Sequence, residues 1–199
     1  MAFVGMRYVV AAPVDTETPG TGITYGNGFV VGKAIQANLT ITRNNNPLYA
    51  DDTIAEEDNG IISMSVQLGV DDIDDDVREK LLGEIKTNTA ASGATASYVY
   101  DETDQPAPYV GFGYMRVRRK GGTTYYQGLW CHKAIFGIDS ENAQTKAESI
   151  TWDTPVLTGR ISGVSFGGHI NFRRKKEFAT ETEARTWLNS QAGITQQGT

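Results

Sequence analysis

Residues 109–136 read YVGFGYMRVRRKGGTTYYQGLWCHKAIF. Two segments rich in aromatic and β-branched residues, Tyr109 to Arg119 and Thr123 to Phe136, flank the sequence Lys120-Gly121-Gly122. Glycine readily adopts the positive φ that tight turns need, so two glycines between strand-like segments predict a β-hairpin. We therefore expect long antiparallel strands in this part of the chain.

Two earlier segments alternate between apolar and polar residues, which is typical of strands with one buried face. The apolar positions are Ile35, Ala37, Leu39 and Ile41 in the first segment and Ile62, Met64, Val66, Leu68 and Val70 in the second. A second hairpin is predicted further on, where Ile150 to Ser162 and His169 to Phe178 flank the glycine-rich residues 163–168.

Two short helices are predicted from their end signals. Residues 74–83 read DDDVREKLLG, with acids at the N-terminus, where the helix dipole is positive, and Gly83 at the C-terminus. Thr180 and Glu183 have the spacing of a capping box, and Ala184, Trp187 and Leu188 follow at helical spacing up to Gly193. We expect the second helix to pack on the sheet.

The expected fold is mainly β: an antiparallel β-sandwich or barrel with a short helix packed on it and a C-terminal helix. We interpret residues 1–199 as a single domain. Its expected parts are an irregular N-terminal arm at 1–28, a core at 29–178 with loops at 43–60 and 86–108, and a C-terminal helix and tail at 179–199.

Composition excludes several classes of function. The 199 residues carry 18 basic and 24 acidic side chains, a net charge of −6, which argues against a protein that holds nucleic acid or an anionic membrane surface. Cys131 is the only cysteine, which excludes an intrachain disulfide and favours synthesis in a reducing cytosol. We expect neither a signal peptide nor membrane insertion, because no apolar run is long enough.

Three matches to catalytic or metal-binding motifs are incomplete. Gly163 to Gly167 fits G-x-S-x-G, but the helix and the acid that a hydrolase needs do not follow. The series Asp72, Asp74, Asp76 begins like a calcium loop, but the required glycine and glutamate are missing. Cys131 and His132 are adjacent in a predicted strand and so point to opposite faces. We expect no enzyme activity, no catalytic residues, no cofactor and no metal.

Charge is unevenly distributed along the chain. The segment from Asp51 to Glu84 has a net charge of −10, which leaves +4 for the rest. Basic residues cluster at Arg116, Arg118, Arg119 and Lys120 and at Arg173, Arg174, Lys175 and Lys176. Two interpretations stay open: ordinary solvated loops, or opposite charges through which one copy contacts the next head to tail.

The order and spacing of several segments resemble the major tail protein of long-tailed, non-contractile bacteriophages. These segments are Tyr25-Gly26 to Gly32-Lys33-Ala34-Ile35, Leu48-Tyr49-Ala50-Asp51-Asp52, Leu68-Gly69-Val70-Asp71-Asp72, Pro108 to Tyr114, Lys146 to Ile150, Trp152 to Pro155, and Phe178 to Leu188. The resemblance implies a structural virion protein of the tail tube type, assembled in the bacterial host cytoplasm into stacked six-membered rings through which double-stranded DNA passes without specific binding. Its implied partners are itself, the tape-measure protein, and the tail-tip and tail-terminator proteins.

Two sets of residues are the resulting site candidates. The expected contacts between subunits are made by Leu48, Tyr49, Ala50, Asp51, Asp52, Arg173, Arg174, Lys175 and Lys176. Because an acidic wall repels phosphates, the candidates for the lining of the lumen are Asp71, Asp72, Asp74, Asp75 and Asp76.

Two alternatives remain from the sequence. One is a single-ring tail terminator or capsid-associated protein with the same fold. The other is a carbohydrate-binding β-sandwich with an aromatic platform. The residues that could form that platform are Tyr109, Tyr114, Tyr125, Tyr126 and Trp130.

Overall fold

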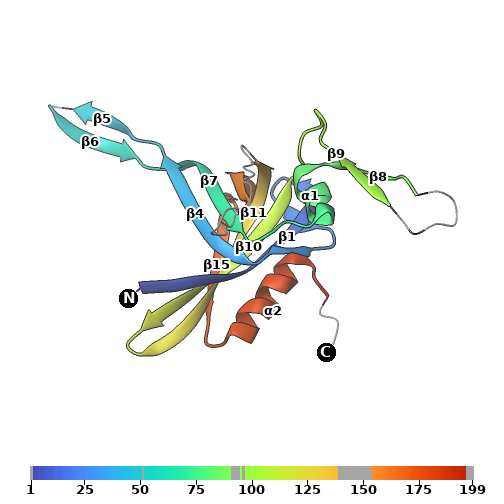
Figure 1. Cartoon of the computed structure of the whole chain (residues 1–199). Coiled ribbons are helices and arrows are strands. Elements are labelled where there is room, and N and C mark those ends of the chain that lie inside the picture. The colour runs from blue at the N-terminus through green and yellow to red at the C-terminus, as the bar shows by residue number, and fades with distance from the viewer. Residues whose placement is uncertain (1, 51, 91–94, 96, 139–153, 196–199) are drawn as a thin grey trace, which may run out of the picture.

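The computed structural model describes residues 2–50, 52–90, 95, 97–138 and 154–195, and this part of the chain is mainly β with two helices (Figure 1). The elements in chain order are β1 (Ala2–Thr18), β2 (Gly22–Tyr25), β3 (Phe29–Gly32), β4 (Ala34–Arg43), β5 (Asn46–Ala50), β6 (Thr53–Asp58), β7 (Ile61–Val70), α1 (Asp75–Leu82), β8 (Ile85–Asn88), β9 (Tyr98–Asp101), β10 (Val110–Lys120), β11 (Thr123–Ile138), β12 (Val156–Ser162), β13 (Val164–Phe166), β14 (His169–Asn171), β15 (Arg173–Phe178) and α2 (Glu181–Ala192).

Nine of the described strands form one antiparallel sheet in the order β2-β1-β10-β11-β12-β7-β4, with β15 paired to β11 and β3 paired to β1. Only Lys33 separates β3 from β4, yet β3 pairs with β1 and β4 pairs with β7. The sheet therefore curves back on itself: β4, the last strand in the order, follows directly in the chain from β3, which pairs with β1. The predicted mainly β, antiparallel architecture with two helices is confirmed.

The sheet has a core on each side, which explains why Val110 to Met115 of β10 are all buried. Phe112 and Tyr114 belong to the inner core, which β7, β12 and α1 complete. Met115 points the other way, into an outer core that α2 covers. In Figure 1, α2 lies along one face of the β10–β11 region, consistent with its contacts to β1, β10, β11 and β15.

Both predicted helices are confirmed. Gly83 ends α1 with a φ of 82°. Thr180 begins α2 with the predicted capping box: its hydroxyl accepts a hydrogen bond from the Glu183 amide at 3.3 Å, and the Glu183 carboxylate accepts one from the Thr180 amide at 3.1 Å. These local signals satisfy backbone donors that a helix start leaves unpaired.

The strands predicted from alternation are also present, as β4 and β7. Met64, Val66, Leu68 and Val70 of β7 are buried as expected. Ile62 is not: it is 60% exposed, because a register shift at the end of β4 places Ile61 next to the core instead.

The expected irregular arm at 1–28 is wrong. Residues 2–18 form the 17-residue strand β1, which pairs with β10, and Val9 to Ala12 are completely buried. Pro13 is compatible with this long strand because of its position. It lies where β1 changes its second partner: β3 pairs with β1 as far as Ala11, and β2 pairs with β1 from Val14 onward. The missing amide hydrogen of proline therefore costs no hydrogen bond between strands.

The two expected loops are largely hairpins. Within residues 43–60, β5 and β6 pair with each other, and within residues 86–108 β9 pairs with β8. Both hairpins project from the sheet, at opposite sides of the view in Figure 1.

The predicted pairing of residues 150–162 with 169–178 is also wrong, although residues 150–153 lie outside the described part. β12 and β15 pair one after the other along β11, and β12 also pairs with β7. Only the short strands β13 and β14 form a hairpin, with its turn at Gly167 and Gly168. Strand partners depend on contacts distant in sequence, which alternation does not specify.

Candidate functional site: interaction surfaces

Large apolar side chains are exposed on both projecting hairpins. On the β5–β6 hairpin, Leu48 is 59% exposed and Ile54 is 56% exposed. On the β8–β9 hairpin, Ile85, Tyr98 and Val99 are each nearly half exposed. Neither group belongs to the inner or the outer core. Exposed apolar side chains on projecting segments are typical of surfaces that another molecule covers.

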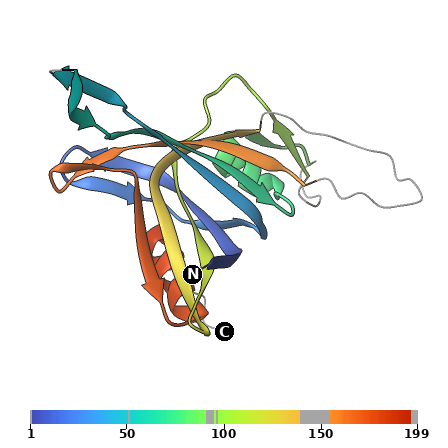
Figure 2. The same cartoon turned by 90° about the vertical axis from the view of Figure 1, so that its left-hand side faces the viewer.

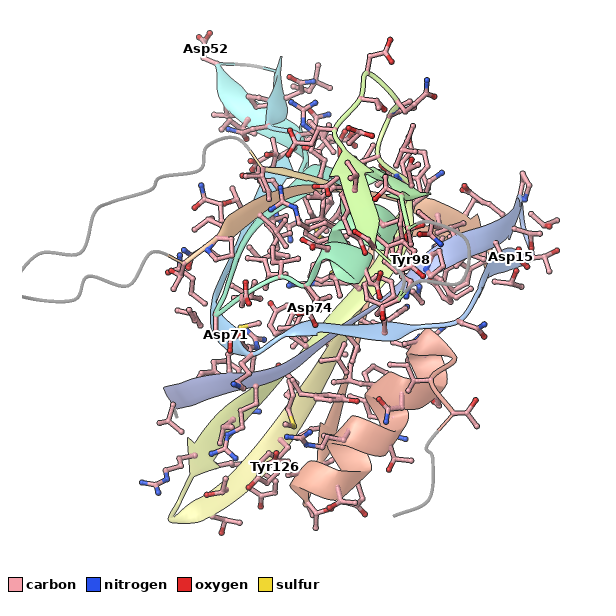
Figure 3. The ribbon with its side chains drawn as sticks, turned by 45° about the vertical axis from the view of Figure 1, so that its right-hand side comes forward. Asp15, Asp52, Asp71, Asp74, Tyr98 and Tyr126 are labelled. Carbon is pink, nitrogen blue, oxygen red and sulfur yellow. The ribbon has the colours of Figure 1, made fainter. Side chains whose placement is uncertain are left out.

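The β5–β6 hairpin is also strongly acidic. Residues 46–58 contain five acidic side chains and no basic one. Glu56 and Glu57 are exposed, and Asp52 lies at the tip with a φ of 60° (Figure 3). Hydrogen bonds from the Gly60 amide and the Asn44 side chain lower the pKa of Asp58. This hairpin therefore presents apolar groups within a negative field.

The structure places the other predicted contact residues as follows. Tyr49 and Ala50 lie in β5, Asp51 lies outside the described residues, and Arg173 to Lys176 form the first four residues of β15. Figures 1 and 2 both show the β5–β6 hairpin projecting away from β15. The acidic and basic candidates are thus not brought together within one copy.

The basic residues of β15 are distributed over the two faces of the sheet. Arg174 donates a hydrogen bond to Gln191 of α2 at 3.1 Å, and Lys176 lies 5.2 Å from the ring of Phe178. Arg173 and Lys175 point to the opposite face, because side chains alternate along a strand. The basic cluster is therefore two surfaces, of which only one adjoins α2.

The five acids proposed for the lumen gather at the junction of β7 and α1: Asp71, Asp72, Asp74, Asp75 and Asp76. Two of them have basic partners. The Lys33 backbone amide donates to Asp71 at 2.7 Å and lowers the pKa of that carboxyl, and the Lys33 Nζ lies 3.3 Å from its other oxygen. Lys86 and, at 2.9 Å, the Tyr100 hydroxyl donate to Asp76 and lower its pKa as well.

The other three acids of this group, Asp72, Asp74 and Asp75, form no ion pair with any residue that the structure describes, and all three are exposed. Figure 3 shows Asp71 and Asp74 near the crossing of the strands, far from Asp52. The acidic segment of the sequence is therefore two separate acidic surfaces.

An open cleft of about 720 Å³ lies beside these acids, where β1, β3 and α2 meet. Its walls carry both signs of charge. Glu181 forms ion pairs with Arg7 at 2.7 Å and with Arg185 at 2.8 Å, and these partners lower the pKa of Glu181. Asp72 and Asp74 also line the cleft without a described ion-pair partner, so the cleft combines paired charges with a small excess of negative charge.

The apparent catalytic motifs have structural explanations. Ser165 lies in β13 between Gly163 and the Gly167 turn, and a strand follows instead of a helix. Cys131 is buried in the inner core, and burial raises its pKa to about 12. His132 points the other way, toward Phe166, and burial lowers its pKa to about 4. Within the described ranges, no group of three or more His, Cys, Asp or Glu side chains could hold a metal ion.

The aromatic residues do not form an exposed platform. Trp130 is completely buried, with its indole NH donating to the Tyr25 hydroxyl at 3.1 Å, and Tyr114 is 2% exposed. Tyr109 is exposed, but it lies over Lys133 instead of beside another candidate ring. The set that sequence suggested for carbohydrate stacking is thus dispersed between the outer core, the inner core and the surface.

A comparison with models of known protein families finds no match for this chain, and a search of curated protein sequences finds none either. In the described part of the chain, neither α1 nor α2 has the length and apolar character of a membrane-crossing helix.

Sequence reasoning missed two groups of surface residues. The exposed Tyr98 and Val99 of the β8–β9 hairpin fall in a segment interpreted as a loop, although Tyr98-Val99-Tyr100 has the β-branched and aromatic composition of a strand. Phe3 and Val4 near the N-terminus are about half exposed, and they were assigned to an irregular arm.

Proposed function

We propose that this chain is the subunit of a bacteriophage tail tube, a structural virion protein that polymerises as stacked six-membered rings around a channel for DNA. The single observation that carries the proposal is the apolar surface of the two projecting hairpins, which no part of either core covers. Exposing these side chains is unfavourable in an isolated subunit, whereas contacts between copies would bury them.

The distribution of charge supports contacts of one specific kind. Figure 3 shows Asp52, at the tip of the acidic β5–β6 hairpin, and Tyr126, near the turn of the β10–β11 hairpin, at different ends of the subunit, and the basic residues of β10 lie in that second hairpin. Contacts between two different surfaces of identical subunits are heterologous, and they generate rings or open polymers. Opposite charges on those surfaces would also orient the subunits as they meet.

Unpaired strand edges provide further support. Within the described residues, β4 pairs on one side only, with β7, and residues 2–7 of β1 pair on one side only, with β10. Unpaired backbone groups at a sheet edge readily accept a strand from another chain. In the tail tube proposal, neighbouring copies in a ring complete the sheet at these edges.

The channel would pass DNA without retaining it. Asp72, Asp74 and Asp75 remain the best candidates for an acidic wall, because Asp71 and Asp76 interact with Lys33 and Lys86. A wall of this sign repels phosphates, whereas a basic wall would hold DNA through counterion release. The tape-measure, tail-tip and tail-terminator proteins are the further partners in this proposal, and the virion tail is the location.

Electron microscopy of the purified full chain at increasing protein concentration tests the function. We expect long hollow tubes built of regularly stacked rings. Rings that never stack would indicate a tail terminator instead, and protein that remains monomeric at every concentration would contradict the proposal. Binding to a glycan array in the absence of polymer would favour the carbohydrate-binding alternative.

A further inference from the structure

Arg116 of β10 is a half-buried cation without an anionic partner in the described part of its own chain. Its Nη2 donates a hydrogen bond to the Gln127 side chain at 2.7 Å, and its guanidinium carbon lies 4.1 Å from the centre of the Phe3 ring. Its buried Nε has no hydrogen-bond partner. Burial lowers the pKa of Arg116, and the nearby positive charge of Arg173 lowers it further. A guanidinium in this position would be stabilised by an incoming carboxylate.

The position of Arg116 on β10 explains why it is accessible to another molecule. Side chains alternate along the strand, so Arg116 follows Phe112 and Tyr114 on the inner face. Those two rings are covered in the inner core, where β12 pairs with Lys133 to Ile138 of β11, away from the hairpin turn, and β7 pairs with β12. Arg118, which forms an ion pair with Glu177 at 2.7 Å, and Lys120 continue the same row toward the hairpin tip. The result is a basic surface beside the exposed ring of Phe3.

The β5–β6 hairpin carries the complementary pair of groups. Leu48 and Glu56 are directly opposite each other in the strand pairing, which places their side chains on one face of the hairpin. Both are exposed, and no described residue forms an ion pair with Glu56. The Leu48 side chain could therefore contact the Phe3 ring while the Glu56 carboxylate meets the guanidinium of Arg116.

We propose that Arg116 and Phe3 form the receptor for Glu56 and Leu48 on the β5–β6 hairpin of a second copy. The proposal rests on the tail tube function and names the contact that joins one subunit to the next. The two terminal nitrogens of the guanidinium can hold both oxygens of one carboxylate, whereas the buried Nε is out of reach, and the Phe3 ring covers one side of the guanidinium.

The two halves of this contact cannot meet within one subunit. Figure 3 shows Asp52, at the tip of the acidic hairpin, at the opposite end of the molecule from Tyr126, which adjoins Gln127. The contact is therefore between copies and head to tail, and its repetition gives a ring or an open polymer.

Charge exchange tests the pairing. Arg116→Glu and Glu56→Arg, each alone, should raise the critical concentration for tube formation by about tenfold to a hundredfold. The double variant should bring the critical concentration most of the way back to the wild-type value. Arg119→Glu is the matched control. It makes the same change of charge on the same strand, but on the face toward α2, and should leave the critical concentration within about threefold of wild type. Critical concentration is measured by pelleting, and circular dichroism checks each fold.

Each outcome has a definite meaning. If wild type forms tubes but Arg116→Glu assembles like Arg119→Glu, or the double variant is no better than either single one, the receptor assignment is wrong while the tail tube function stands. If Arg116→Glu only weakens salt-dependent DNA binding, the basic surface serves phosphates and the assignment is again wrong. If wild type forms no polymer, both proposals fail. Should the reversal disturb folding, Arg116→Gln removes the charge alone and must still raise the critical concentration.

Discussion

The exposed Leu48 side chain provides a quantitative test of the proposed assembly. Leu48 is 59% exposed in the subunit, and burying a whole leucine side chain is worth about 1.5–3 kcal/mol. Covering the exposed part at a subunit contact would therefore contribute about 1–2 kcal/mol. Since 1.4 kcal/mol is a factor of ten in an equilibrium constant, Leu48→Ser should raise the critical concentration for tube formation about 5-fold to 30-fold.

The assay measures the protein that remains in the supernatant after centrifugation across a concentration series. Leu48→Met is the matched control, because it keeps an apolar side chain of similar volume and should leave the critical concentration within about twofold of wild type. Leu48 contacts neither core, so the free energy of unfolding of the subunit should change by less than about 0.5 kcal/mol in both variants. A critical concentration for Leu48→Ser equal to that of wild type would show that no subunit contact buries Leu48.

Three further predictions concern the subunit itself, measured by urea unfolding below the critical concentration. Leu188→Ala should lower the free energy of unfolding by about 2–5 kcal/mol, because Leu188 is completely buried in the outer core; Thr182→Ala, on the exposed side of the same helix, should change it by less than about 0.5 kcal/mol. Gly113→Ala should cost about 1–3 kcal/mol, because its Cβ would lie 2.6 Å from a carbonyl oxygen of β11, whereas Gly137→Ala has open space and should be nearly neutral. His132 favours its neutral form in the fold, so stability should decrease by up to about 3 kcal/mol as the pH falls from 6.5 to 4, and His132→Gln should remove that slope.

Each of these has a result that would contradict it. Equal effects of Leu188→Ala and Thr182→Ala would mean that α2 does not pack as described. A neutral Gly113→Ala would mean that β10 and β11 can separate at that position. An unchanged pH slope in His132→Gln would assign the slope to other titrating groups.

The parts of the fold that sequence predicts are those with local signals. A cap, a turn glycine or an alternating strand requires only a few neighbouring residues, so α1, α2, β4, β7 and the β10–β11 hairpin follow from the sequence. The assignment of β1 failed because Pro13 and the nearby glycines are depleted in strands, and only the tertiary partners of β1 show that they are tolerated there. The pairing of β12 and β15 with one strand, β11, is likewise a long-range property.

Of the candidate site, the sequence predicts only where acidic and basic residues cluster. The sequence identifies clusters of acids and bases, but the environment of Arg116 depends on Phe3, more than a hundred residues away, and on Gln127 across the hairpin. Neither neighbour carries a charge, so no charge pattern indicates them. The exposure of Leu48 is also invisible in the sequence, because an apolar residue in an acidic segment could equally lie in a core.

The division of the acidic segment constrains how charge can act in an assembly. At α1, Arg78 pairs with Glu84 at 2.7 Å, and Lys33 and Lys86 pair with two more carboxylates, so intramolecular partners already reduce the field there. On the β5–β6 hairpin there is no basic residue, and the exposed carboxylates keep their full charge beside exposed apolar groups. In the proposed tube, attraction between copies should therefore depend mainly on the hairpin, and repulsion of DNA on the few acids near α1 that have no described basic partner. Added salt should then weaken assembly through the hairpin contact, because screening acts most strongly on exposed charges. The paired acids of α1 should respond less.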